Sequence, residues 1–244
     1  MIPRIWNGLS KLCPDRFEAF RQPGDGDEFD ALARYFWNVA LCEALTPVLN
    51  GAEICLRNAI HLAVSTAEGD EMWFSSKIGR LRPQEQELIQ RATRDLANKS
   101  KFTPGPGDYV SELTFKFWTG LLSDHYQVFV WHDRLDKLMP NLGIGDRNVG
   151  TVRKAFNRIR ELRNRAFHHE PILNGANAVE IHDQAVEAIG WISNYHKRCI
   201  ATFDRFPEVF ASGETYYREL LEIEFKLRAP VAQPTLFQDD TFRR

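Results

Sequence analysis

The stretch from Arg163 to His168 carries side chains suited to cleaving RNA. Cleavage through the 2′-hydroxyl needs a proton acceptor, a proton donor and charge stabilisation at the phosphate. A histidine supplies the acceptor or the donor near neutral pH. An arginine directs two N–H donors at phosphate oxygens without any metal. One histidine cannot easily serve both ends, so we expect either His169 to assist or a second copy of the site to face this one across a dimer seam.

The helix predicted to carry these residues is locally basic. Between Arg147 and Glu170, seven positive and two negative residues give a balance of +5, in a chain whose net charge is −2. This asymmetry favours a phosphate-attracting surface, although a solvated basic face remains an alternative explanation. We expect RNA contacts from four of the cations, namely Arg153, Lys154, Arg160 and Arg165.

Arg163 falls on the apolar stripe of this helix. A 3.6-residue period builds that stripe from Val149, Val152, Phe156, Ile159 and Ala166. A guanidinium there must meet either an internal carboxylate or a cleft in which a phosphate is its partner. Asn164 and His168, four residues apart, share the adjacent face. Pro171 predicts that the helix ends at His168 or His169, so a helix-end cap is the structural alternative for His168.

The remaining periodicity predicts an all-α fold. Gln127 to Trp131 is the one short bulky run, and it lacks the alternation of a strand. Pro47 predicts a kink or a new start, and Asp108 and Asp146 are expected to begin helices. The expected helices cover residues 27–47, 47–67, 83–101, 109–122, 134–138, 146–169, 176–203 and 213–227.

The composition fits a compact protein that needs no cofactor. A chain of 244 residues with 43% apolar content can bury a core. We expect an arm or short helix at 1–26, one helical domain at 27–228 with a possible boundary near 103–108, and a loose tail at 229–244. No leader or long apolar run is apparent, which favours a cytoplasmic protein. None of Cys13, Cys42, Cys55 and Cys199 forms a Cys-x-x-Cys pair, so no metal site is expected, and Cys42 and Cys55 are expected to be buried thiols.

Residues 162–171, LRNRAFHHEP, resemble the signature of the Abi-like (abortive infection) branch of the HEPN ribonuclease superfamily. Three further segments fit that family in order, and the resemblance covers about residues 29–193: 36–45 (FWNVALCEAL), 53–60 (EICLRNAI) and 113–118 (LTFKFW).

The resemblance implies a HEPN-type helical bundle, usually a homodimer, that cleaves RNA without a metal. Carried over by residue, Arg163 and His168 are the catalytic pair and Asn164 is the polar residue beside the arginine. The implied setting is antiviral defence in a prokaryote. The alternatives are a non-catalytic RNA-binding or regulatory protein that holds a structured RNA or a partner, and a toxin held silent by an antitoxin.

Arg57, Asn58 and His61 form a possible second half-site, because Arg57 and His61 are four residues apart on one helix face. Their spacing departs from Arg-x-x-x-x-His, and Glu53 with Arg57 fits an ordinary i,i+4 ion pair, so a structural role is favoured. Other residues receive no site role: Phe36, Trp37, Phe117 and Trp118 are expected in the core, and His125, His132, His182 and His196 lack metal-ligand spacing.

Overall fold

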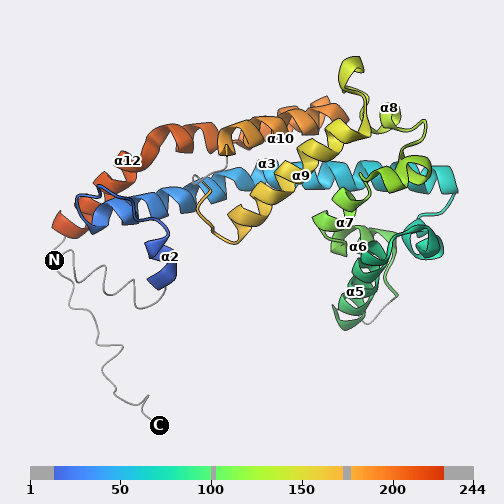
Figure 1. Cartoon of the computed structure of the whole chain (residues 1–244), viewed down its shortest axis with the longest axis horizontal. Coiled ribbons are helices and arrows are strands. Elements are labelled where there is room, and N and C mark those ends of the chain that lie inside the picture. Colours follow the sequence, from blue (N-terminus) through green and yellow to red (C-terminus); the bar gives the residue numbers. More distant parts are fainter. Residues whose placement is uncertain (1–13, 100–102, 173–176, 228–244) are drawn as a thin grey trace, which may run out of the picture. The chain divides into compact units, whose positions relative to one another are not determined.

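The fold is described by a computed structural model that covers residues 14–99, 103–172 and 177–227. Every regular element in these ranges is helical, so the expected all-α class is confirmed for them (Figure 1). The expectations for residues 1–13 and for the tail at 229–244 lie outside the described residues.

The chain divides into two compact units. The first contains the described residues up to Leu41 and those from Pro207, and the second is Cys42–Phe206. Residues 103–108 lie inside the second unit. The first unit consists of α2 (Pro14–Glu18), the beginning of α3 (Glu28–Glu68) and nearly all of α12 (Phe206–Leu227).

An arginine joins α3 to α12 and to the turn that follows α2. Arg34, on α3, donates from Nε to the carbonyl of Phe20 at 2.7 Å and forms an ion pair with Glu214 of α12 at 2.9 Å. Trp37 donates from its indole nitrogen to the carbonyl of Val209 at 2.9 Å. The expected core position of Phe36 is wrong, because its side chain is 37% exposed. In this unit α2 and α12 cover part of the surface of α3, and Phe36 lies outside that part.

The second unit packs the remaining helices around the second part of α3. The predicted core residues Phe117 and Trp118 are fully buried here, and the expected burial of Cys42 and Cys55 is confirmed. Its other elements are α4 (Trp73–Ser76), η1 (Ile78–Arg80), α5 (Pro83–Lys99), α6 (Pro106–Glu112), α7 (Phe115–Gly120), η2 (Asp124–Tyr126), η3 (Gln127–Trp131), α8 (Leu135–Leu138), η4 (Ile144–Asp146), α9 (Val149–Phe167), α10 (Ala178–Ile192) and α11 (Asn194–Phe203).

The helix α3 continues through Pro47, so the predicted interruption is wrong. Proline removes one backbone hydrogen bond and costs about 3 kcal/mol within a helix. Leu45, Val48 and Leu49 on either side are fully buried, and burying three such side chains offsets that cost. By length and composition α3 could also cross a membrane, but 56% of its most apolar window is buried inside the protein. A core helix passes the same test.

Four other helix boundaries differ from the expectation. Two helices, α6 and α7, replace the single helix from 109 to 122, and Asp108 lies inside α6, where its carboxylate accepts from Gly105 N at 2.8 Å. Asn148 rather than Asp146 caps α9, because its side chain accepts from Thr151 N at 2.7 Å. Ser193 caps α11 and so separates it from α10. The helix α12 begins at Phe206 and contains a break at Gly213, where φ is 69°.

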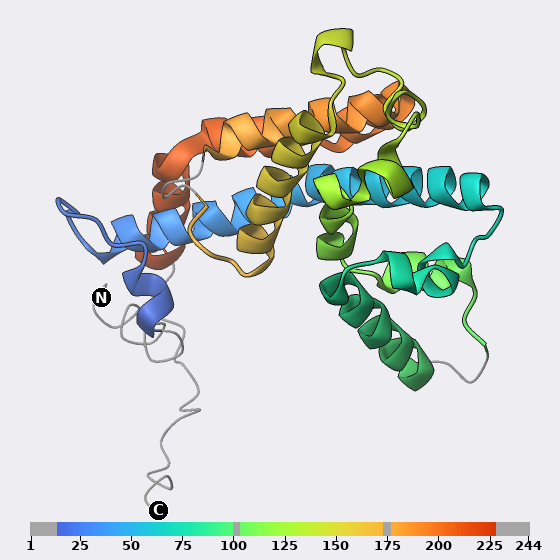
Figure 2. The same ribbon diagram turned by 45° about the vertical axis from the view of Figure 1, so that its right-hand side comes forward.

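The helix α9 is held by its apolar stripe. All the predicted stripe residues, Val149, Val152, Phe156, Ile159 and Ala166, are buried. The helix packs against α10 and α7 and crosses α3, with α10 running alongside α3 (Figures 1 and 2). Gly51 of α3 permits the close approach of α10 and α11, because a Cβ there would lie 3.0 Å from Ile200 and 3.2 Å from Ile189.

Replacing Phe156 by alanine should loosen α9. The ring is fully buried and meets Phe115 of α7 edge-on, with centroids 6.5 Å apart. We expect Phe156→Ala to lower the free energy of unfolding by about 3 to 5 kcal/mol in urea titrations. The exposed neighbour Lys154→Ala serves as the control and should change it by no more than about 0.5 kcal/mol. Equal losses in the two variants would contradict the packing described here.

Candidate functional site

The end of α9 adopts a defined backbone motif. The helix ends at Phe167, one residue before the predicted end, and His168 is the C-cap residue. His169 N donates to Ala166 O at 3.1 Å and Glu170 N donates to Arg165 O at 3.0 Å, which is the hydrogen-bond pattern of a Schellman motif. His169 has a φ of 53°, a left-handed conformation that usually belongs to glycine. This turn takes the chain off the helical path at His169, whereas His168 is still bonded to the last turn of the helix.

His168 and Asn164 lie together on the exposed end of α9. Both side chains are exposed, and His168 N donates to Asn164 O at 3.0 Å. These two residues were expected on one face. His168 occupies the C-cap position, which the alternative role of a helix-end cap requires, and its side chain is exposed, which a catalytic role requires. The geometry therefore permits either role.

Arg163 is held by a carboxylate from α3. Its Nε lies 3.4 Å from Oε2 of Glu53, and the two side chains are 30% and 13% exposed. Its guanidinium also lies over the ring of Phe167, 4.4 Å from the centroid, a cation–π contact. Of the two partners expected for Arg163, the structure supplies the internal carboxylate. The side chain remains half-buried, at the border between the core and the exposed helix end.

The carboxylate of Glu53 lies near the positive charges of two arginines. Burial raises the pKa of its carboxyl, while the nearby charges of Arg163 and Arg57 act in the opposite direction. The expected i,i+4 ion pair with Arg57 is replaced by the pair across helices with Arg163. Two guanidinium groups thus share one carboxylate, which leaves a net positive charge beside the end of α9.

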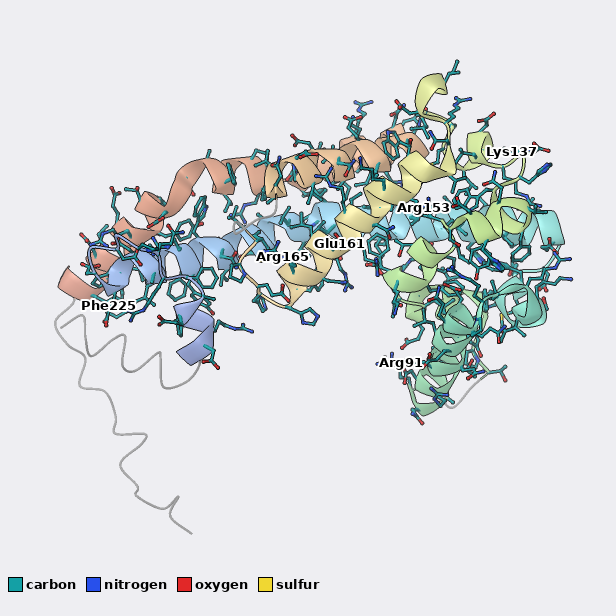
Figure 3. All side chains as sticks on the ribbon, in the orientation of Figure 1. Arg91, Lys137, Arg153, Glu161, Arg165 and Phe225 are labelled. Carbon is teal, nitrogen blue, oxygen red and sulfur yellow. The ribbon has the colours of Figure 1, made fainter. Side chains whose placement is uncertain are left out.

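Carboxylates from other elements neutralise much of the positive charge along α9. Arg153 pairs with Asp124 at 2.9 Å, and Arg165 pairs with Glu170 at 3.7 Å and donates to the carbonyl of Pro171. Both of these cations are labelled along the helix in Figure 3. Three further arginines form ion pairs of the same kind: Arg147 with Asp136, Arg158 with Glu180, and Arg163 with Glu53.

Two of the four cations that are expected to contact RNA have no carboxylate partner. Neither Lys154 nor Arg160 forms an ion pair with any residue in the described part of the chain. Lys154 is exposed and Arg160 is half-buried, with its Nε enclosed. Because pairs at a protein surface contribute only about 0.2 to 1 kcal/mol, the paired cations can also exchange a carboxylate for a phosphate.

The possible second half-site is not assembled. Nδ1 of His61 accepts from the indole nitrogen of Trp73 at 3.2 Å, and burial lowers the pKa of this histidine. Asn58 instead lines a pocket on another side of α3, and Arg57 acts on Glu53. The three side chains therefore face different neighbours. Nor do three His, Cys, Asp or Glu side chains gather in a geometry suited to a metal ion within residues 14–99, 103–172 and 177–227.

Comparison with protein-family models, curated proteins and solved structures finds no match to this chain.

Two neighbours of Arg163 were not assigned to the site from the sequence. Phe167 is 43% exposed and lies four residues after Arg163, and this i,i+4 spacing was a signal that could have identified the pair. Glu53 was assigned to Arg57 by the same rule of spacing. No sequence signal could have found its partner on α9, because that contact arises from the crossing of two helices.

The left-handed backbone at His169 predicts an unequal response to glycine and alanine. Glycine adopts this conformation without strain, whereas a Cβ there costs about 1 to 2 kcal/mol. We expect His169→Gly to be more stable than His169→Ala by about 1 kcal/mol in urea titrations. Equal stability of the two variants would show that this φ is not maintained in solution.

Glu53 predicts a pH dependence of stability. Because burial raises its pKa above the usual 4.5, the folded chain holds this proton more readily than the unfolded chain. Relative to Glu53→Gln, the wild type should therefore be most stable below pH 4.5 and lose stability as the pH rises through the raised pKa. Urea titrations of both proteins between about pH 4 and 7 would measure this. The exposed Glu87→Gln is the control, and a difference that does not vary with pH would contradict the prediction.

Proposed function

We propose that this protein is a metal-independent endoribonuclease of the HEPN type. The observation that carries the proposal is the end of α9, where Asn164 and His168 are exposed beside an arginine whose guanidinium is held by Glu53 and Phe167. The histidine supplies one of the two proton transfers that cleavage through the 2′-hydroxyl requires, and the arginine supplies charge stabilisation at the phosphate. The resemblance of residues 162–171 to the Abi-like signature adds the reaction class.

In the proposed reaction His168 moves a proton and Arg163 stabilises charge. His168 takes the proton of the 2′-hydroxyl or returns one to the departing 5′-oxygen. Arg163 directs its terminal nitrogens at the phosphate while Glu53 restrains its Nε. Phe167 offers an exposed ring on which a base can stack, and Asn164 adds an amide to the same surface. Lys154 and Arg160 extend the positive charge for the RNA backbone.

A homodimer completes this scheme, because two copies supply the two histidines that acid and base catalysis need. Each chain then contributes half a site, with Arg163 and His168 from both copies around one phosphate. The biological role that follows is defence of a prokaryotic cell against viruses, by cutting RNA in the cytoplasm. The contact of Arg163 with Glu53 favours one rival, a non-catalytic RNA-binding or regulatory protein, since an arginine already held by a carboxylate is also a stable structural element.

Cleavage of a labelled RNA in the presence of EDTA tests the mechanism. We expect the wild type to remain active, His168→Ala to lose about 10²- to 10⁴-fold in rate, and Arg163→Ala to lose about 10²- to 10³-fold. The exposed His132→Ala is the matched control and should keep its activity. Full activity of His168→Ala, or loss of wild-type activity in EDTA, would refute the mechanism. RNA that copurifies without turnover would favour the non-catalytic rival.

Mixed dimers test whether the site is shared. In a 1:1 mixture of wild type and His168→Ala that has exchanged subunits, about one quarter of the dimers contain two wild-type chains. If both histidines are needed at one phosphate, activity should fall to about that fraction of the unmixed wild type at equal total protein. A fall to only one half would show that each chain acts alone. Growth arrest on expression of this chain by itself, relieved by a second protein, would point to a toxin held by an antitoxin.

A further inference from the structure

The second unit contains a pocket of about 500 Å³ that the ribonuclease proposal does not use. Such a volume falls within the usual range for small-molecule sites. The pocket lies between one face of α3, the short helix α8 and the junction of α10 with α11. All of its lining residues belong to the second unit, and none of them is Arg163, Asn164 or His168.

The body of the pocket is apolar. Along α3 its wall includes Ile54 and Leu62, which are 38% and 67% exposed, and Ile192 closes it from α10. Ala59 and Ala63 leave space between these larger side chains. Exposed aliphatic side chains that line a hollow gain free energy when an apolar ligand covers them.

The polar groups of the pocket are cationic or neutral. Arg134, Lys137 and His196 line it, and no aspartate or glutamate does. The guanidinium of Arg134 donates one hydrogen bond, to the carbonyl of Phe129. The ammonium of Lys137 and the ring of His196 form no ion pair or hydrogen bond with any described residue. Figure 3 labels Lys137 on α8, close to the far end of α3. The acid next to it in the chain, Asp136, pairs with Arg147 at 3.3 Å.

We propose that this pocket binds a small amphipathic carboxylate from solution, with its aliphatic chain against Ile54 and Leu62 and its carboxylate at Arg134 and Lys137. An apolar body matches the aliphatic wall, and an anionic head is complementary to cations that lack a carboxylate partner. Neutral apolar ligands satisfy only the first condition. Inorganic anions satisfy only the second.

Calorimetric titration of the full chain with octanoate tests the proposal. We expect octanoate to bind at least tenfold more tightly than octanamide, and hexanoate to bind about 16-fold more weakly than octanoate, at about fourfold for each methylene removed. Lys137→Ala and Arg134→Ala should each weaken octanoate binding. The control is Lys116→Ala, an exposed lysine of the same unit on α7, which should leave it unchanged.

A further variant tests whether the apolar wall contributes to octanoate binding, at a position where the fold should not be disturbed. Leu62→Ser acts on a mainly exposed side chain, so the protein should keep its thermal stability while octanoate binding weakens. Equal binding of octanoate and octanamide, equal losses in Lys137→Ala and Lys116→Ala, or no binding up to the solubility limit would overturn the proposal. A wild-type dimer that becomes a monomer on Lys137→Glu in analytical ultracentrifugation would also overturn the proposal, because a second copy of the chain would then cover the pocket.

Discussion

A half-buried arginine on the apolar side of a helix requires a negative partner, and the pair of Arg163 with Glu53 meets this requirement. The pair joins α9 to α3 at the point where the two helices cross. Removing the carboxylate leaves a guanidinium at the edge of the core, and removing the guanidinium leaves a carboxylate whose pKa burial has already raised. The position of the α9 end, and so of Asn164 and His168, depends on this contact.

The termination of α9 is the second constraint. Because His169 takes the left-handed conformation, the chain reverses its course directly after His168. A regular helix would keep His168 on the helical surface, some 140° around the axis from Arg163 at about 100° per residue. His168 keeps this position, because its N still donates to Asn164 O at 3.0 Å, and the Schellman turn takes only His169 off the helical path. The strain at His169 is of the kind found where a backbone presents functional side chains.

Much of this arrangement could be predicted from the sequence. The apolar period of α9 identified its buried stripe, and Pro171 located its end to within one or two residues. Local rules failed where tertiary contacts compete with them. The helix α3 continues through Pro47 because Leu45 and Val48 are buried on either side of it. Glu53 pairs with Arg163 rather than with Arg57 because α3 and α9 cross at this point. The pocket could not be predicted, because helices distant in sequence, α3, α8, α10 and α11, form it.

The carboxylate partners of the α9 cations would change how dissolved salt affects the proposed binding of RNA. A protein that neutralises phosphates displaces the counterions condensed on the nucleic acid, and the affinity falls steeply with salt as a result. Arg153 and Arg165, however, must first leave Asp124 and Glu170. Each abandoned carboxylate then attracts a cation from solution, which offsets part of the release. A polyanion bound along α9 therefore has a shallower salt dependence than the number of its basic residues would suggest.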